Sequence, residues 1–199
     1  HFRGCSGEPN LLLRAYHSGD SEEGDWVLRT LHARWPTAPL HAVGISLGGN
    51  MLAKWLGERG EDARFVAAAA SIGSPLDLVA GGHAIGRGFN LLYTKMFLAT
   101  LKDKARDKAQ RFGYAIDVDV LRRARNLYEF DNLYTAPVHG FRDTIDYWTR
   151  ASAKPLLRNV RVPHLVLNAR NDPFVPAESL PGPADVSSDV TLEQPNEGG

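Results

Sequence analysis

Two apolar patterns alternate along the chain. Short runs in which almost every position is apolar cover residues 40–43, 65–72 and 162–169, and such runs are typical of parallel strands that are covered on both faces. Residues 20–34 and 51–56 are instead predicted to be helices. The order helix, strand, helix, strand, with short connections, predicts an α/β fold in which helices flank a mostly parallel sheet. A last short strand is expected at residues 189–193.

The ends of the two helices carry residues that start and stop helices. We expect Asp20 to be the N-cap of the first helix, with Glu23 in capping-box position three residues later. Pro36 ends that helix. The second helix is expected to fray at Gly57 and Gly60.

Residues 77–150 contain no run typical of a strand. Helical segments are expected at residues 89–98, 118–130 and 140–151, so we predict one α/β domain over residues 1–199 with a helical cap inserted at about 77–150, over one end of the sheet. The mixed charges of residues 102–108 indicate a solvated helix face. Four cap side chains either line an acyl pocket or pack in the core: Phe89, Leu92, Met96 and Phe97.

Charge and cysteine content narrow the possible function. The chain has 23 basic and 23 acidic residues, which removes the whole-chain electrostatic argument for binding nucleic acid or an anionic membrane. Its single cysteine, Cys5, excludes an internal disulfide and fits a reducing, cytoplasmic compartment. No apolar run approaches the roughly 20 residues that span a bilayer, and no cluster has metal-ligand spacing. Because the chain begins at His1 rather than methionine, we expect it to be a piece of a longer protein.

The strongest candidate for chemistry is Ser46. Residues 44–48 read Gly-Ile-Ser-Leu-Gly between a predicted strand and a predicted helix, which is the context of a nucleophile elbow. In such a turn the serine has a strained backbone conformation. Gly44 and Gly48 fit this turn, because we expect a side chain at either position to collide with it. Cys5 and Ser6 are alternative nucleophiles, but their glycine-rich surroundings favour a simple turn.

A candidate acid follows the third buried run. Asp172 lies on the loop after residues 162–169, at the end of a strand, where enzymes built on parallel sheets keep functional residues. The alternative is that Asp172 forms a turn before Pro173, which is a common role of aspartate.

Four stretches together resemble the YheT-type branch of the α/β-hydrolase superfamily: residues 2–10, 44–50, 130–141 and 167–174. The resemblance implies a serine hydrolase that cleaves carboxylic or acyl-lipid esters with serine, aspartate and histidine in that chain order. Ser46 then takes the nucleophile position and Asp172 the acid position, with the backbone N–H of Leu47 as an oxyanion donor. It implies no cofactor and no metal, and its partner is a small ester or acyl-lipid substrate.

The chain departs from that pattern in the third member of the triad. All seven histidines precede Asp172: His1, His17, His32, His41, His83, His139 and His164. We expect the catalytic histidine beyond Gly199 and the loop with the second oxyanion donor before His1, so that these 199 residues alone are inactive. His139 is the local rival, whereas His41 and His164 lie within strand runs. An acyltransferase with the same triad and an inactive binding module remain alternatives, and the sequence does not determine the oligomeric state.

Overall fold

The computed structural model describes residues 1–198. The chain divides into two compact units. Ser18–Gly81 and the residues from Arg150 onward form one, called here the sheet unit. His1–His17 and Gly82–Thr149 form the other, called here the helical unit.

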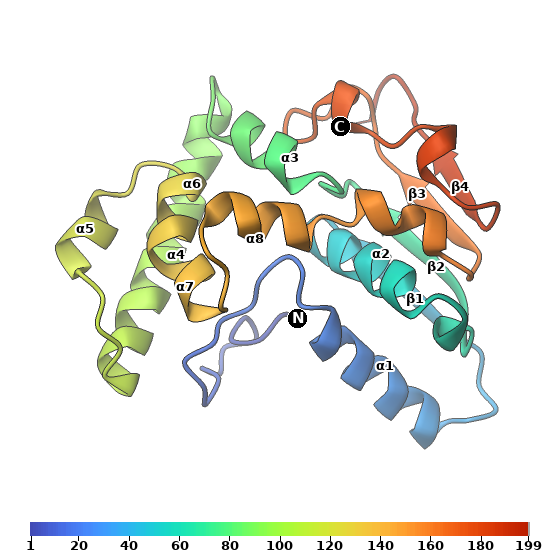
Figure 1. Ribbon diagram of the computed structural model, residues 1–199, viewed down its shortest axis with the longest axis horizontal. Coiled ribbons are helices and arrows are strands. Elements are labelled where there is room, and N and C mark those ends of the chain that lie inside the picture. The colour runs from blue at the N-terminus through green and yellow to red at the C-terminus, as the bar shows by residue number, and fades with distance from the viewer. Residues whose placement is uncertain (199) are drawn as a thin grey trace. The chain divides into compact units, whose positions relative to one another are not determined.

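The sheet unit contains four parallel strands in the order in which they occur in the chain (Figure 1): β1 (Leu40–Ile45), β2 (Val66–Ile72), β3 (His164–Leu167) and β4 (Val190–Glu193). Strands β2, β3 and β4 lie within the segments predicted from the sequence, and β1 extends two residues beyond its predicted run. The chain therefore has the predicted α/β fold with a parallel sheet. Because β1 is an edge strand, one side of its backbone carries no strand partner within the described residues.

Helix α2 (Leu47–Arg59) covers one face of the sheet and packs on β1 and β2. Its other neighbour is the short 3₁₀ helix η3 (Lys154–Asn159). Trp55 and Leu56 of α2 are fully buried with Val66, Leu157 and Val166. This single apolar cluster fixes α2 against the sheet.

The opposite face of the sheet is only partly covered. Val43 and Ile45 point to that face of β1 and are 65% and 69% exposed. In register with Ile45 lie Ile72 on β2 and Leu167 on β3, both half-buried. The prediction that residues 65–72 are covered on both sides is therefore wrong within the described residues: β2 alternates between buried and more exposed positions.

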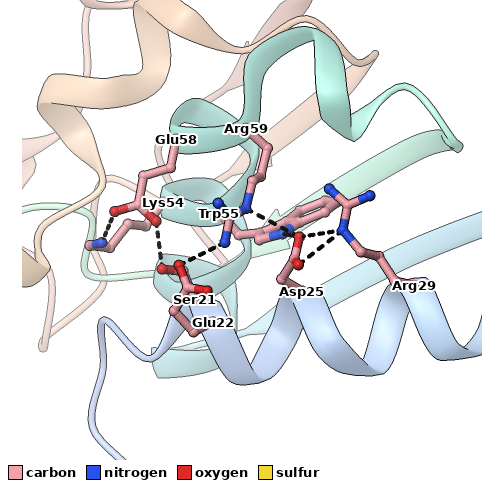
Figure 2. Close-up of polar contacts among 8 residues, drawn as sticks. All are labelled: Ser21, Glu22, Asp25, Arg29, Lys54, Trp55, Glu58 and Arg59. Atoms are coloured by element: carbon pink, nitrogen blue, oxygen red, sulfur yellow. Dashed lines mark hydrogen bonds and ion pairs between the residues drawn. The ribbon is translucent and has the colours of Figure 1, made fainter.

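Helix α1 (Ser21–Arg34) lies along α2 and is joined to it by polar contacts (Figure 2). Asp25 accepts hydrogen bonds from the Trp55 indole (2.8 Å) and from Arg59 (3.1 Å), and Arg59 also pairs with Glu22 at 2.6 Å. Asp20 occupies the N-cap position, but its side chain makes no capping hydrogen bond. The predicted side-chain cap of this helix by Asp20 is therefore absent.

Gly57 does not fray α2, which continues to Arg59 and ends at Gly60 with φ +51°. A Cβ on Gly57 would lie 2.4 Å from the carbonyl oxygen of Leu156. The glycine therefore permits close packing of α2 against η3, a contact between residues about 100 positions apart that local sequence does not reveal.

The helical unit and its borders contain helices and no strand among the described residues. The helices are α3 (Leu78–Ile85), α4 (Asn90–Phe112), α5 (Val118–Arg123), α6 (Leu127–Phe130), the short π-helix η2 (Asp131–Thr135), α7 (Ala136–Val138) and α8 (Thr144–Ala151). The remaining 3₁₀ turns, in the sheet unit, are η1 (Gly60–Ala63), η4 (Ala177–Ser179) and η5 (Pro183–Asp185). None of the described helices has the length and apolarity needed to cross a bilayer.

The charged run at residues 102–108 is only partly a solvated face. Asp103 pairs with Arg106 in solvent, as predicted, but Lys108 is 7% exposed. Its ammonium donates to the side-chain oxygen of Asn10 (2.5 Å) and to the carbonyls of Leu12 (2.7 Å) and Arg14. Lys108 therefore anchors the N-terminal segment onto α4, and desolvation, with nearby Arg111 and Arg3, lowers its pKa.

Candidate active site

Ser46 occupies the turn between β1 and α2 with φ +53° and ψ −122°. It is the one non-glycine residue with positive φ in the part of the chain that the structure describes. A non-glycine residue in this region costs on the order of 1–3 kcal/mol and persists only where its surroundings enforce it. Here the Ser46 N–H donates to the carbonyl of Ile72 on the neighbouring strand at 2.9 Å. The side chain is exposed at the carboxyl edge of the sheet.

The glycines around Ser46 divide into crowded and open positions. A Cβ on Gly44 would lie 2.4 Å from the Gly48 carbonyl, so Gly44 is required as predicted. At Gly48 no atom of the described residues lies within 4 Å of that position, and the prediction that a side chain there would collide is wrong. The crowded residue is instead Gly49, whose Cβ would lie 1.8 Å from the Ser74 hydroxyl. The turn is therefore closed by Gly44 and Gly49.

The first turn of α2 offers backbone donors next to Ser46. Leu47 is the first residue of this 13-residue helix, so its N–H has no acceptor within the helix. The N–H groups of Gly49 and Asn50 donate hydrogen bonds to the Ser46 carbonyl. A helix N-terminus carries partial positive charge, which favours an anion beside Ser46.

Asp172 lies on the loop after β3, and its two oxygens have different surroundings. Oδ1 accepts a hydrogen bond from the Phe174 N–H at 2.8 Å, which is the turn-forming role considered from the sequence. Oδ2 lies 4.0 Å from the position that a Cβ on Gly73 would occupy. Gly73 directly follows Ile72, the residue that accepts from Ser46. Ser46 and Asp172 therefore both lie at the carboxyl end of β2.

Buried polar groups tie the loops after β2 and β3 together. The Asn168 amide donates to the carbonyl of Ser74 at 3.1 Å, and the Gly73 N–H donates to the carbonyl of Leu167 at 2.9 Å. These contacts hold the loop that carries Asp172 against the end of β2. Sequence reasoning placed Asn168 inside a strand run and gave it no role.

A second series of buried hydrogen bonds lies beneath α2. The Ser71 hydroxyl donates to the Gly49 carbonyl at 2.9 Å, so His164 Nε2, also 2.9 Å from Ser71 Oγ, acts as the donor in that contact. Burial lowers the pKa of His164 to about 4. The imidazole is therefore neutral and links β3, through β2, to the first turn of α2.

Asn50, in that same first turn, fastens two other segments. Its amide donates to the Ser18 carbonyl (3.0 Å) and the Ala151 carbonyl (2.9 Å), and its oxygen accepts from the Ala153 N–H (3.0 Å). The side chain is fully buried and every contact lies within the sheet unit. Asn50 therefore fixes the helix that begins at Leu47.

Comparison with curated proteins gives two relatives of the chain. The chain is 39% identical to YheT of Escherichia coli over 100% of its own length and 59% of YheT. It is 34% identical to the mouse phospholipase ABHD3, over 90% of the chain and 44% of that protein.

The chain is thus a relative of YheT and of ABHD3. Among solved structures it is similar to the Pyrococcus furiosus esterase Pf2001, with TM-score 0.53 and 14% identity, over 98% of the chain and 59% of that structure. That likeness supports the α/β-hydrolase fold. No protein-family model matches the chain. The chain spans between about two fifths and three fifths of the lengths of these relatives.

Within this α/β-hydrolase chain, the described residues include no histidine hydrogen-bonded to Ser46 or Asp172. His139 belongs to the helical unit, and its two ring nitrogens contact the carbonyls of Thr135 (2.7 Å) and Ala15 (2.9 Å). His41 is exposed on the partly covered face of β1. His164 is engaged beneath α2, so none of the three is placed as a base for Ser46.

The other candidates have simpler surroundings. Cys5 and Ser6 lie in a turn with positive φ at Gly4 and Gly7, and the Lys104 ammonium lies 3.5 Å from the Cys5 sulfur. No group of three potential metal-ligating side chains occurs in residues 1–198.

The cap side chains at positions 89, 92, 96 and 97 are exposed. The interpretation that they pack in the core is therefore wrong.

Proposed function

We propose that Ser46 is the nucleophile of an enzyme that hydrolyses carboxylic esters, with acyl lipids as the substrate class. The observation that carries this proposal is the strained backbone of Ser46 at the end of β1. Ordinary turn chemistry offers no reason to place serine at φ +53°, because glycine adopts that conformation without steric cost. Strain of this kind clusters at functional sites, and relatives of this chain are named as an esterase or a phospholipase.

The reaction would proceed in two acyl-transfer steps. Ser46 Oγ attacks the ester carbonyl carbon while its proton passes to a histidine nitrogen, and the alcohol leaves with that proton. Water then attacks the acyl-serine, with the same histidine as base, and releases the acid. The N–H of Leu47 would donate to the negative oxygen of both tetrahedral intermediates, where one such donor contributes about 3 kcal/mol.

In this proposal Asp172 orients and stabilises the histidine through the carboxylate oxygen that is not engaged in the turn. The catalytic histidine and the second oxyanion donor would come from residues other than these 199. The support for this is that His164 and His139 are engaged in other contacts, and that no histidine of the described residues is hydrogen-bonded to Ser46 or Asp172. The 199 residues alone would then turn over esters at a negligible rate.

The test is hydrolysis of p-nitrophenyl butyrate by the full-length gene product and its Ser46→Ala variant. We expect kcat to fall by about 10⁵-fold or more, since loss of the serine in subtilisin costs about 2 × 10⁶. Ser6→Ala, an exposed serine in a glycine-rich turn, is the matched control and should keep full activity. Activity of Ser46→Ala within tenfold of the parent would exclude the proposal. Adding an alcohol acceptor shows whether the acyl group also passes to an alcohol.

A further inference from the structure

The first half of α4 exposes an apolar stripe. It comprises Phe89, just before the helix, and Leu92, Met96 and Phe97, which are 99%, 66%, 63% and 46% exposed. Their offsets of 0, 3, 7 and 8 residues place them on one side of a helix. We call these four residues the α4 face. An exposed cluster of large apolar side chains is unusual on a protein surface unless it contacts something.

The α4 face is not a consequence of a loosely held helix. On the other side of α4, Thr94, Leu98 and Ala105 are buried within the helical unit. The Thr94 hydroxyl donates to the carbonyl of Ile85 at 2.6 Å, which fastens the start of α4 to the end of α3. The helix is therefore fixed in orientation, and the apolar stripe points away from its core.

The acidic and basic residues next to the α4 face along the sequence are all basic. Between Leu78 and Lys102 the sequence has no aspartate or glutamate, whereas Arg87 and Lys95 flank the stripe. Neither side chain makes a hydrogen bond or ion pair within the described residues. In the second half of α4, by contrast, Asp103 and Asp107 pair with arginines.

Acidic groups on the helices packed against α4 are engaged locally. On α5, Asp117 caps its own helix and Asp119 pairs with Arg122 at 3.6 Å. On α6, Glu129 accepts from the Arg125 N–H and the Asn126 amide. Among the described residues, Arg87 and Lys95 therefore have no acidic partner on α4, α5 or α6.

We propose that the α4 face docks on an anionic phospholipid bilayer. The four side chains would enter the boundary between headgroups and acyl chains, and Arg87 and Lys95 would contact phosphate, as in helices that lie in a membrane interface. A second copy fits less well, because a twofold contact through this face would bring like charges together. The zero net charge of the whole chain conceals this local imbalance. The inference does not depend on Ser46.

The test measures cosedimentation with vesicles of phosphatidylcholine containing about one third phosphatidylserine, at about 0.1 M salt. The full-length gene product is used in its Ser46→Ala form so that the lipid stays intact. We expect Phe89→Ser/Met96→Ser to weaken binding at least about tenfold by removing apolar insertion. Arg87→Gln/Lys95→Gln should also weaken it at least about tenfold, and only on vesicles with phosphatidylserine.

Trp26→Ser is the matched control, because Trp26 is a large side chain 68% exposed on α1 in the other unit. Its binding should equal that of the parent, and thermal unfolding should show all variants folded. No binding by the parent, or equal binding by the parent and both double variants, would overturn the proposal. So would self-association of the parent that Phe89→Ser/Met96→Ser abolishes without vesicles, since the occupant would then be a second copy.

Discussion

Two turns at the carboxyl edge of the sheet carry the two residues proposed for catalysis, and their backbones differ. Ser46 follows β1 with φ +53° and an exposed hydroxyl. Asp172 follows β3 without positive φ and makes the Asx hydrogen bond to Phe174 that aspartate commonly makes before proline. The first residue is in a conformation that its own chemistry disfavours, and the second is in one that its chemistry favours.

This difference determines how much each turn says about function. The strain at Ser46 has no local explanation, so a role for the hydroxyl accounts for an otherwise unfavourable choice of residue. The geometry at Asp172 is explained equally well by the turn, and only its free oxygen near Gly73 suggests more. A substitution that separates the two roles of Asp172 is therefore the most informative change in the second turn.

Asp172→Asn should preserve the turn and remove the charge. The asparagine oxygen can still accept a hydrogen bond from the Phe174 N–H, so the free energy of unfolding should change by less than about 1 kcal/mol. If the carboxylate orients the catalytic histidine, kcat on p-nitrophenyl butyrate should fall by about 10⁴-fold, as the corresponding change does in a serine protease. Asp172→Ala should lose both activity and the turn. Full activity in Asp172→Asn would leave Asp172 with its turn-forming role alone.

Gly49→Ala and Gly48→Ala compare crowded and open positions in the first turn. A Cβ on Gly49 would meet the Ser74 hydroxyl at 1.8 Å and the Gly44 carbonyl at 2.8 Å, so we expect a loss of about 3 kcal/mol or more in unfolding free energy. Gly48→Ala should be neutral or stabilising by up to about 1 kcal/mol, because alanine favours helix. Chemical denaturation measures both. Equal losses would mean that the turn is closed differently.

His164 links β3 to the first turn of α2 and should make stability depend on pH. The folded state holds its pKa at about 4 against 6.5 when unfolded, so the unfolded state binds more protons between these values. The contribution of neutral His164 to the unfolding free energy is then fully present above pH 6.5. It is lost, by up to about 3 kcal/mol, as the pH drops to 4. His164→Gln keeps a donor for Ser71 and does not titrate.

The measurement is the difference in unfolding free energy between the wild type and His164→Gln across pH 4 to 7, and we expect that difference to change over this window. Taking the difference removes other groups such as Asp131, for which burial raises the pKa to about 6 and gives the opposite sign. A difference that stays constant with pH would show that His164 is not held neutral by burial.

Ser46→Gly and Ser46→Ala test the strain directly. Glycine adopts φ +53° without a steric penalty, whereas alanine, like serine, has that penalty. Ser46→Gly should therefore be about 1 kcal/mol more stable to unfolding than Ser46→Ala. At Ser6, which lacks positive φ, the order should reverse because glycine gains more freedom on unfolding. Denaturation of the four variants gives both comparisons. The same order at both sites would remove the argument from strain.

The sequence predicted the strands because apolar runs and helical spacing are local properties of the chain. It also placed Ser46 between a strand and a helix, although it assigned the crowding of Gly49 to Gly48. The errors at Gly57 and Lys108 have a common cause: their partners are Leu156 and Asn10, each about 100 residues away. Long-range partners also explain why His164 and Asn168 received no role, since their contacts on Ser71 and Ser74 exist only in the folded sheet.

The most direct test of the central claim is to find the residue that a fluorophosphonate modifies. The full-length gene product is treated with the probe, digested, and analysed by mass spectrometry, with Ser46→Ala treated in parallel. We predict one stoichiometric adduct on the peptide that contains Ser46 and none in the Ser46→Ala variant. An adduct on Cys5 or Ser6, or labelling that persists in Ser46→Ala, would contradict the assignment of Ser46 as the nucleophile.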